Sequence, residues 1–327
     1  MKNPIDIFVE LGECLQTFGQ DPDTRKVIAE ACRANEWFTS TEVETAVQAI
    51  CEEFLDRGKL TDWLARYKRP ATLSSRSVLV VMAGNIPLVG FFDLLCVLAA
   101  GHRCLVKTSA KDTVLMRYVI DLLLQIDPEL PLAVYDESTQ VQAVIATGSD
   151  NANRYFRTQY AGISALLRGN RHSVAVLSGR ETDTQLAALG NDLFSYSGLG
   201  CRNVSLLFVP RGYRVKLPSR TMNPKYRHNY LQRRALRRIC GQTFADLGFA
   251  LLIPQSEFPQ ALSEISLIEY DDLSQVTEWL RVHETQMQCV VSECIEHPRC
   301  VPFGRSQHPA LGDYPDAVDV MDFLYGL

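Results

Sequence analysis

Apolar and polar positions along the 327-residue chain change their pattern near residue 70. Up to about residue 68, the spacing of apolar residues is typical of amphipathic helices. Asp21 followed by Pro22 predicts the start of one helix, and Thr41 with Glu44 resembles a capping box at the start of another. The chain is therefore expected to begin with a helical segment.

From Val78 onward, short apolar runs alternate with helical stretches of roughly 10–15 residues. The expected strands read VLVVM, CLVK, VQAVIATG, ISALLRG and SVAVLSG, and the expected helices cover 88–99, 113–125 and a stretch that begins at 150. This alternation predicts an α/β fold with a parallel, doubly wound sheet.

A second unit is expected to begin near Arg180. It is predicted to contain helices at 182–196, at about 224–247 and at 273–283, and strands that read NVSLLFVP, ALLIP, SLIEY and QCVVS. The loop-rich tail is expected to pack back on the first unit. The resulting division is a first domain at 1–178, a second at 179–295 and a C-terminal segment at 296–327.

Charge and composition narrow the class of protein. A formal net charge of −5 argues against nucleic acid as the main partner, because phosphate backbones select for an excess of Lys and Arg. The most apolar region, 77–106, is interrupted by polar residues, Pro and Gly, which argues against a membrane span. The first residues mix acids into their apolar pattern, unlike a secretion signal, and the ten cysteines are irregularly spaced. Reduced thiols and a cytoplasmic location are expected.

The first candidate for chemistry is Asn85 in the segment AGNIPLVG at 83–90. The segment follows a buried strand and opens a helix, so it lies where ligands bind in open α/β sheets. The Asn85 amide could donate a hydrogen bond to a developing oxyanion. The alternative is that Asn85 simply caps the helix, with Pro87 in its first turn.

Two further strand ends could hold a nucleotide. Lys107, Thr108 and Ser109 follow one strand and offer a charge and hydroxyl donors to a phosphate or ribose. Gly148 and Ser149 follow another strand and open a helix, whose free N–H groups suit a diphosphate. An edge lysine and an ordinary capped helix are the alternatives.

The stretch YSGLGCRNVSLLFVP contains Cys201. Gly198 and Gly200 permit a tight backbone before it, so its own N–H can point at a thioester oxygen. Arg202 offers a positive charge that would lower the pKa of the thiol. The alternative is a core cysteine at the start of an apolar strand.

A basic run between Lys216 and Arg238 holds eight Lys or Arg and no Asp or Glu, with Arg233 and Arg234 near its centre. It is either a solvated helix face or a docking surface for a polyphosphate such as coenzyme A, or for an acidic partner. Cysteines and a histidine at 289–300 match no standard zinc spacing, so no metal is expected.

Taken in order, these segments resemble the aldehyde dehydrogenase superfamily, and most closely its acyl-CoA reductase branch, the type found in bacterial bioluminescence operons. The segments that carry the resemblance over about residues 77–327 are NIPL (85–88), VKTS (106–109), TGS (147–149), RGNRHSVAVL (168–177), GLGCRNVSLLFV and VPFG (301–304). In that family they are an oxyanion motif, a ribose-contacting segment, a nucleotide-phosphate turn, a hinge, the catalytic cysteine strand and a C-terminal Pro-Phe-Gly. The resemblance implies a Rossmann-like nucleotide-binding domain preceded by N-terminal helices, and a second α/β catalytic domain.

Two departures from the family pattern are informative. Oxidising members carry a Glu in the hinge, four residues before a Lys, as the base that hydrolyses the thioester. Aligning Arg171 with that Lys places Leu167 at the Glu position, so a Cys thioester would persist until hydride arrives. NAD-preferring members often carry a Glu three residues after the strand Lys, where this chain has Ala110. The resemblance therefore favours NADPH, with NADH as the alternative.

The resemblance implies an NAD(P)H-dependent acyl-CoA reductase. In this interpretation Cys201 attacks an acyl thioester, Asn85 and the Cys201 N–H hold the oxyanion, and coenzyme A leaves. NADPH, held by the Lys107 and TGS segments, delivers hydride and an aldehyde is released. The alternatives are a reductase of acyl-carrier-protein or acyl-phosphate substrates, and a non-catalytic acyl-binding subunit of a reductase complex. An acyl-activating or acyl-carrier protein and a second copy of the chain are candidate partners.

Overall fold

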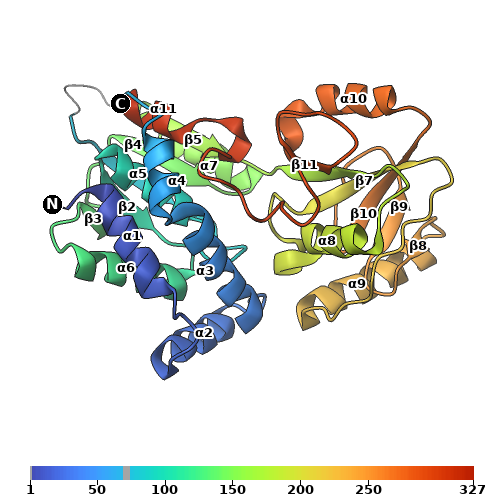
Figure 1. Cartoon of the computed structure of the whole chain (residues 1–327), viewed down its shortest axis with the longest axis horizontal. Coiled ribbons are helices and arrows are strands. Elements are labelled where there is room, and N and C mark those ends of the chain that lie inside the picture. The colour runs from blue at the N-terminus through green and yellow to red at the C-terminus, as the bar shows by residue number, and fades with distance from the viewer. Residues whose placement is uncertain (1, 69–73) are drawn as a thin grey trace. The chain divides into compact units, whose positions relative to one another are not determined.

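The computed structural model describes residues 2–68 and 74–327 and divides the chain into two compact units (Figure 1). Unit 1 comprises Met1–Asn170 and Pro309–Leu327, and unit 2 comprises Arg171–His308. The expected boundaries stand at 178/179 and 295/296. The first differs from the structural boundary because the strand β6 (His172–Val176) pairs with two strands of the second sheet.

Unit 1 begins with helices, as the apolar spacing predicts. They are α1 (Pro4–Leu15), α2 (Pro22–Ala34), α3 (Ser40–Phe54) and α4 (Arg57–Leu64). The prediction that Asp21 caps a helix is confirmed, since its carboxylate accepts the N–H groups of Asp23 and Thr24. The capping box predicted at Thr41 is wrong, because Thr39 caps α3 instead and exchanges hydrogen bonds with Glu42.

The sheet of unit 1 is parallel throughout its described strands, in the order β3-β2-β1-β4-β5. The strands are β1 (Ser77–Val81), β2 (Arg103–Lys107), β3 (Leu132–Val134), β4 (Ala143–Thr147) and β5 (Ser164–Arg168), and the helices between them are α5 (Phe91–Ala100), α6 (Thr113–Ile126) and α7 (Asp150–Gln159). The strand order reverses at β1, which makes the loops after β1 and β4 a topological switch point. The prediction of a parallel, doubly wound sheet is confirmed.

Both faces of this sheet are covered. Val78 and Val80 of β1 lie in a core shared with the N-terminal helices, α5 and α6, whereas Leu79 between them faces a smaller core on the other side. The C-terminal helix α11 (Val320–Tyr325) belongs to the larger core, and its Leu324 carbonyl lies 2.9 Å from Nε2 of His102. Among the described residues, no helix is long and apolar enough to cross a membrane.

Unit 2 is built on a second sheet in the order β12-β11-β6-β7-β10-β9-β8. Its other strands are β7 (Val204–Pro210), β8 (Ala245–Asp246), β9 (Leu251–Pro254), β10 (Glu264–Tyr270), β11 (Met287–Ser292) and β12 (Cys300–Val301), and its helices are α8 (Asp183–Phe194), α9 (Pro224–Ile239) and α10 (Leu273–Val282). The described strands pair in parallel apart from β8, which runs antiparallel to β9. Residues of α10 such as Val276 and Leu280 pack on one face, against Phe208 of β7.

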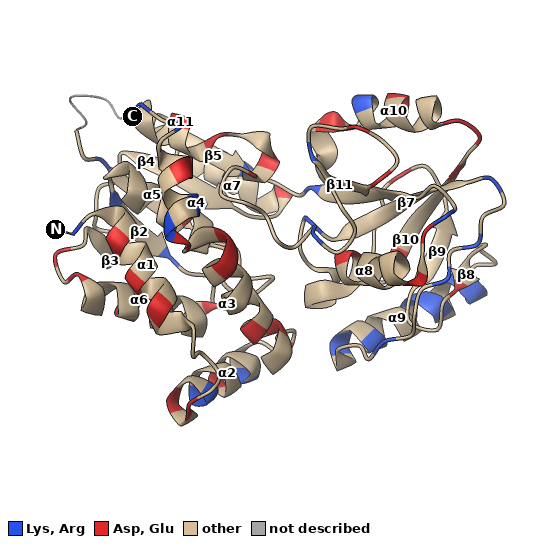
Figure 2. Ribbon diagram, viewed as in Figure 1, with Lys and Arg blue, Asp and Glu red and all other residues tan. Residues whose placement is uncertain are grey.

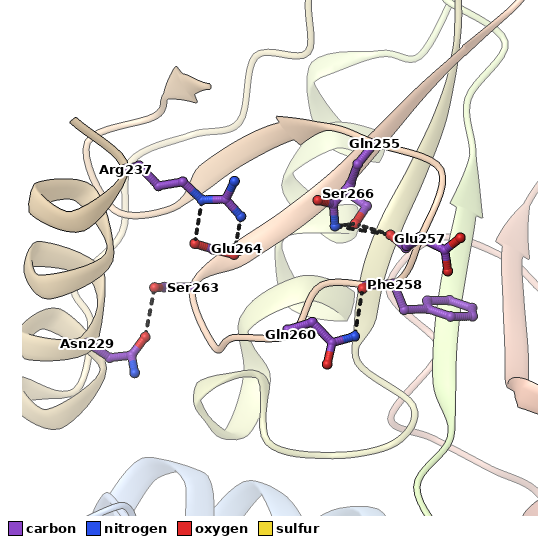
Figure 3. A network of polar contacts seen from close by, with 9 residues as sticks. All are labelled: Asn229, Arg237, Gln255, Glu257, Phe258, Gln260, Ser263, Glu264 and Ser266. Atoms are coloured by element: carbon purple, nitrogen blue, oxygen red, sulfur yellow. Dashed lines mark hydrogen bonds and ion pairs between the residues drawn. The ribbon is translucent and has the colours of Figure 1, made fainter. Parts of the chain in front are cut away.

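The helix predicted at about 224–247 is wrong at its end, since α9 stops at Ile239. Gly241 follows with a φ of +63°, a left-handed conformation that glycine adopts without steric cost and that ends a helix. Figure 3 shows how α9 is held beside β10: Arg237 donates two hydrogen bonds, of 2.9 and 2.8 Å, to the carboxylate of Glu264. Ser263 donates to the side-chain oxygen of Asn229 at 2.9 Å.

Candidate active site

The candidate residues of unit 1 lie in three loops at one edge of its sheet. Because the sheet is parallel, the carboxyl ends of β1, β2 and β4 all meet at that edge. The loop after β1 carries Asn85, and the end of β2 carries Lys107 followed by Thr108 and Ser109. The loop after β4 carries Gly148 and Ser149. The structure therefore brings the three sequence-predicted segments to the same edge.

Asn85 is not a helix cap. The helix α5 begins at Phe91 and its N-cap is Gly90, so the predicted start at Leu88 is also wrong. Leu88 instead has a φ of +56°, which is uncommon for a residue with a branched, bulky side chain. Its N–H donates a 2.8 Å hydrogen bond to Oδ2 of Asp112. Asn85 thus belongs to a fixed turn rather than to the helix.

The segment after β2 offers polar groups at its surface. The Lys107 side chain is about half exposed, with Nζ 3.9 Å from a carboxylate oxygen of Glu137 and 6.0 Å from the ring centroid of Tyr135. The hydroxyls of Thr108 and Thr113 lie 3.2 Å apart. An exposed lysine with one weak ion pair is available to bind an anion.

The TGS turn opens α7 as predicted. Ser149 is the N-cap, and its hydroxyl accepts the N–H of Ala152 at 3.3 Å. The N–H of Gly148 already donates to the carbonyl of Arg168 at 3.2 Å. Any phosphate bound here would therefore be held by the first-turn N–H groups of α7 rather than by that of Gly148.

In unit 2, Cys201 follows an unusual turn. Three consecutive residues, Tyr196, Ser197 and Gly198, have φ values of +53°, +57° and +70°. Left-handed conformations of non-glycine residues cost energy and persist only where the surroundings enforce them. Tyr196 and Ser197 are both buried, whereas Cys201 is exposed. The prediction of a helix over 182–196 is correct only to Phe194, where α8 ends.

The side chain of Asn203 stabilises this turn through three hydrogen bonds. Its side-chain oxygen accepts the N–H of Gly200 at 2.8 Å. Its amide nitrogen donates to the carbonyls of Asp192, at 3.1 Å, and Ser195, at 3.0 Å. The Asn203 side chain is buried and its hydrogen bond to Asp192 is shielded from water, whereas those with Gly200 and Ser195 are partly buried. The side chain connects the end of α8 to the residue before Cys201.

The hydroxyl of Ser173 stabilises the turn at Cys201. Its hydroxyl donates to the carbonyl of Cys201 at 2.9 Å and accepts the N–H of Cys289 at 3.2 Å. The Cys289 thiol lies 3.1 Å from the same hydroxyl, so two cysteines flank Ser173. Cys289 is buried, and burial raises the pKa of its thiol to about 11.

The Pro-Phe-Gly segment at 302–304 is anchored to α8 through Asp192. The buried Asp192 carboxylate accepts the N–H groups of Gly304, at 2.6 Å, and Ser306, at 3.0 Å. Burial raises the pKa of this carboxyl, and the two N–H donors oppose that rise. Because Asp192 also accepts from Asn203 through its carbonyl, the segment and the cysteine turn share one support.

A sequence comparison matches residues 15–217, more than half of the chain, to the acyl-CoA reductase (LuxC) family. The chain belongs to this family. It is accordingly an oxidoreductase that acts as an acyl-CoA reductase, and the expected activity is confirmed. No protein with curated annotation matches the chain.

Solved structures place this reductase in the aldehyde dehydrogenase fold. Aldehyde dehydrogenase 21 from Physcomitrella patens is 10% identical, with a TM-score of 0.69 over 99% of this chain and 83% of that chain. Betaine aldehyde dehydrogenase from Staphylococcus aureus is 11% identical, with a TM-score of 0.63 over 89% and 70%. NADP-dependent glyceraldehyde-3-phosphate dehydrogenase from Bacillus halodurans is 13% identical, with a TM-score of 0.58 over 88% and 73%. At these identities the likeness establishes the fold.

The basic run of this reductase lies largely on α9, where Figure 2 shows Lys and Arg gathered along the helix. Arg234 forms an ion pair within unit 2, with Nε 2.6 Å from the carboxylate of Asp246. For both Arg233 and Arg234, Nε is buried and makes no hydrogen bond among the described residues. The two predicted contacts thus differ in the ion pair that Arg234 forms with Asp246.

The sequence does not predict four residues that support the candidate site: Ser173, Asp192, Asn203 and Asp112, of which only Asp112 is considered there, as a possible helix cap. Only Asn203 has a local signal, since an Asn just before an apolar strand is typical of a turn. The partners of Asp112 and Ser173 lie 24 and 28 residues away along the chain, so no local pattern reveals them.

Proposed function

We propose that the reductase uses Cys201 as its nucleophile, NADPH as its hydride donor and coenzyme A thioesters as its substrates. The observation that carries the proposal is the turn at 196–201, in which an exposed thiol follows a strained backbone held by Asn203 and Ser173. Such rigid placement lets the backbone N–H of a nucleophilic residue point at an oxyanion.

Cys289 is the second candidate for the nucleophile, because it also contacts Ser173. A thiolate is the reactive species, and a thiol with a pKa of about 11 is almost wholly protonated at neutral pH. Its burial also hinders access by an acyl thioester. These two properties favour the exposed Cys201.

The proposed chemistry has two stages. The Cys201 thiolate attacks the thioester carbonyl, the oxyanion is held by the Asn85 amide and the Cys201 N–H, and the C–S bond to coenzyme A breaks, so that its thiolate departs and takes up a proton. NADPH supplies hydride to the enzyme thioester. The second C–S bond then breaks, which releases the aldehyde and returns the Cys201 thiolate.

Leu167 supports reduction rather than hydrolysis. It lies in β5 and packs against the smaller core of unit 1, at the position where the family resemblance places a hydrolytic Glu. A leucine cannot accept a proton from water, so the enzyme thioester would wait for hydride.

The choice of NADPH rests on the loop after β2. Lys107 is half exposed, and Ala110 stands where NAD-preferring relatives often have an acid. A positive charge suits a 2′-phosphate, and the Glu137 carboxylate 3.9 Å from Nζ of Lys107 is 90% exposed, so it pairs only weakly with that charge. The free N–H groups at the start of α7 would suit the diphosphate.

Two details of the substrate are also proposed. Arg233 on α9 is assigned to the phosphates of coenzyme A, as the less committed of the two candidate arginines. The same surface would suit an acidic acyl-carrier protein, which is the second candidate for the acyl donor. If Arg233 binds the phosphates of coenzyme A, Arg233→Glu should raise the KM for acyl-CoA and leave the KM for an acyl-carrier-protein thioester unchanged.

The test is an NADPH-oxidation assay with acyl-CoA substrates of several chain lengths. Asn85→Ala should lower turnover by roughly 10²–10³, because one oxyanion donor is worth about 2.7–4 kcal/mol. Cys201→Ala should abolish turnover, and mass spectrometry of the wild type should find the acyl adduct on Cys201. Cys240→Ala, which removes another exposed thiol, is the matched control. An adduct on Cys289 would reassign the nucleophile, and turnover without any adduct would argue against a covalent cysteine thioester.

A further inference from the structure

Two loops of unit 1 contact each other at the carboxyl ends of β1 and β2. They are residues 83–88 after β1 and residues 107–112 after β2. At the strand ends, the N–H of Met82 donates to the carbonyl of Lys107 at 3.0 Å. At Gly84, an added Cβ would lie 2.6 Å from the Ser109 hydroxyl oxygen, so only glycine allows this approach. The Leu88 N–H then bonds to Asp112, as described above.

Asp112 behaves unlike an ordinary helix cap. It stands at the N-cap of α6, yet among the described residues its side chain makes no capping hydrogen bond. One carboxylate oxygen, Oδ2, accepts the Leu88 N–H, and the other, Oδ1, has no hydrogen-bond partner in the described part of the chain. The residue is only 2% exposed, and burial raises the pKa of its carboxyl to about 8.

This arrangement is costly for folding. A buried polar atom without a partner destabilises the folded state, and an Asp at a helix start would gain more by capping the helix. Leu88 adds a second cost through its left-handed backbone. Both unfavourable terms belong to the contact between Leu88 and Asp112, and Leu88 lies three residues after Asn85. Backbone strain of this kind is found mainly at functional sites.

We propose that Asp112 is a positioning residue for Asn85. By accepting the Leu88 N–H, it holds the Asn85 turn in one conformation and ties it to the loop that carries Lys107 and Ser109. The inference rests on the proposed function, in which the Asn85 amide donates to the oxyanion. Asp112 itself touches neither substrate nor cofactor in this assignment.

The test is a double-mutant cycle on the full chain, with kcat and the KM values for acyl-CoA and NADPH. Asp112→Ala should lower kcat about 10-fold or more while both KM values change less than about threefold, because the turn matters most as the oxyanion forms. Asp112→Asn keeps an oxygen acceptor for Leu88 and should recover most of the lost kcat. In the Asn85→Ala background, Asp112→Ala should change kcat by less than about twofold.

Structural damage is measured separately. Circular dichroism and NADPH binding, followed by fluorescence titration, report folding without turnover. Asp21→Ala is the matched control, because it removes another aspartate from a helix start whose hydrogen bonds stay within α2 and the residues before it. It should leave kcat within twofold of wild type.

Each result decides the matter. Full turnover in Asp112→Ala, or losses that multiply in the double variant, would overturn the positioning role while leaving that of Asn85 intact. Full turnover in Asn85→Ala would remove Asn85 from the mechanism and the inference with it. Where Asp112→Ala does not fold, Asp112→Leu, which fills the same buried space without an acceptor, takes its place in both backgrounds, and a loss that is equal in both would again overturn the role.

Discussion

Replacing Asp112 by Asn should make the protein more stable, and the gain should grow with pH. The folded carboxyl has a pKa of about 8, against 3.8 for an ordinary Asp, because it is buried. Between these values the folded protein holds a proton that the unfolded chain has lost. Wild-type stability therefore falls as pH rises from about 4 to about 8, whereas an amide at this position does not titrate.

The size of the effect follows from the pKa difference. Each pH unit inside the window changes the free energy of unfolding by up to about 1.36 kcal/mol. From pH 5.5 to 7.5, the advantage of Asp112→Asn over wild type should therefore increase by about 2–3 kcal/mol. Above about pH 8 the increase should stop, because the folded carboxyl then ionises as well.

The assay is urea unfolding followed by tryptophan fluorescence. Trp279 lies in unit 2, and replacing it by Phe in every variant leaves only the tryptophans of unit 1 as reporters. Asp127→Asn is the control: the backbone N–H of Lys2 lowers the pKa of that carboxyl, so its contribution is constant above pH 5. A stability difference for Asp112→Asn that stays flat from pH 5.5 to 7.5 would refute the reasoning.

Two further predictions concern the two units separately. Asn203→Ala removes three buried or partly buried hydrogen bonds around the cysteine turn, so it should lower the free energy of unfolding by about 1–3 kcal/mol and slow both turnover and the alkylation of Cys201 by iodoacetamide. Unchanged kcat and alkylation would show that Asn203 does not hold the turn. Ala110→Glu places a carboxylate beside the proposed 2′-phosphate contact, so the ratio of kcat/KM for NADPH to that for NADH should fall at least about 10-fold. A ratio that does not move would place the 2′-phosphate elsewhere.

The architecture of the two sheets was predictable because it depends on short-range patterns. Apolar runs such as VLVVM, separated by helical spacing, leave few solutions besides a parallel sheet. The helix predicted over 113–125 forms as α6 for the same reason. The family resemblance added the order of motifs along the chain, which periodicity alone does not contain.

The errors arise where a single contact or glycine overrides the local pattern. The helix predicted to continue to 247 ends at Ile239, because Gly241 turns left-handed. The helix predicted from Leu88 begins three residues later, because Leu88 has a left-handed backbone, with its N–H bonded to Asp112. Helical propensity contains no information about a partner 24 residues away along the chain. The conformation of the turn that carries Asn85 could therefore not be predicted from the local sequence pattern.

The two units share a structural device beside their proposed catalytic groups. In unit 1, a left-handed Leu88 is held by the buried Asp112, and in unit 2, left-handed residues at 196–198 precede a turn held by the buried Asn203. Each strained turn lies within five residues of a proposed catalytic group. A strained backbone persists only where surrounding contacts hold it in place. In each turn, a hydrogen bond from the backbone to a buried polar side chain is one of these contacts. The residues that set catalytic geometry in this reductase should therefore be sought among the buried polar supports as well as among the motifs that carry the chemistry.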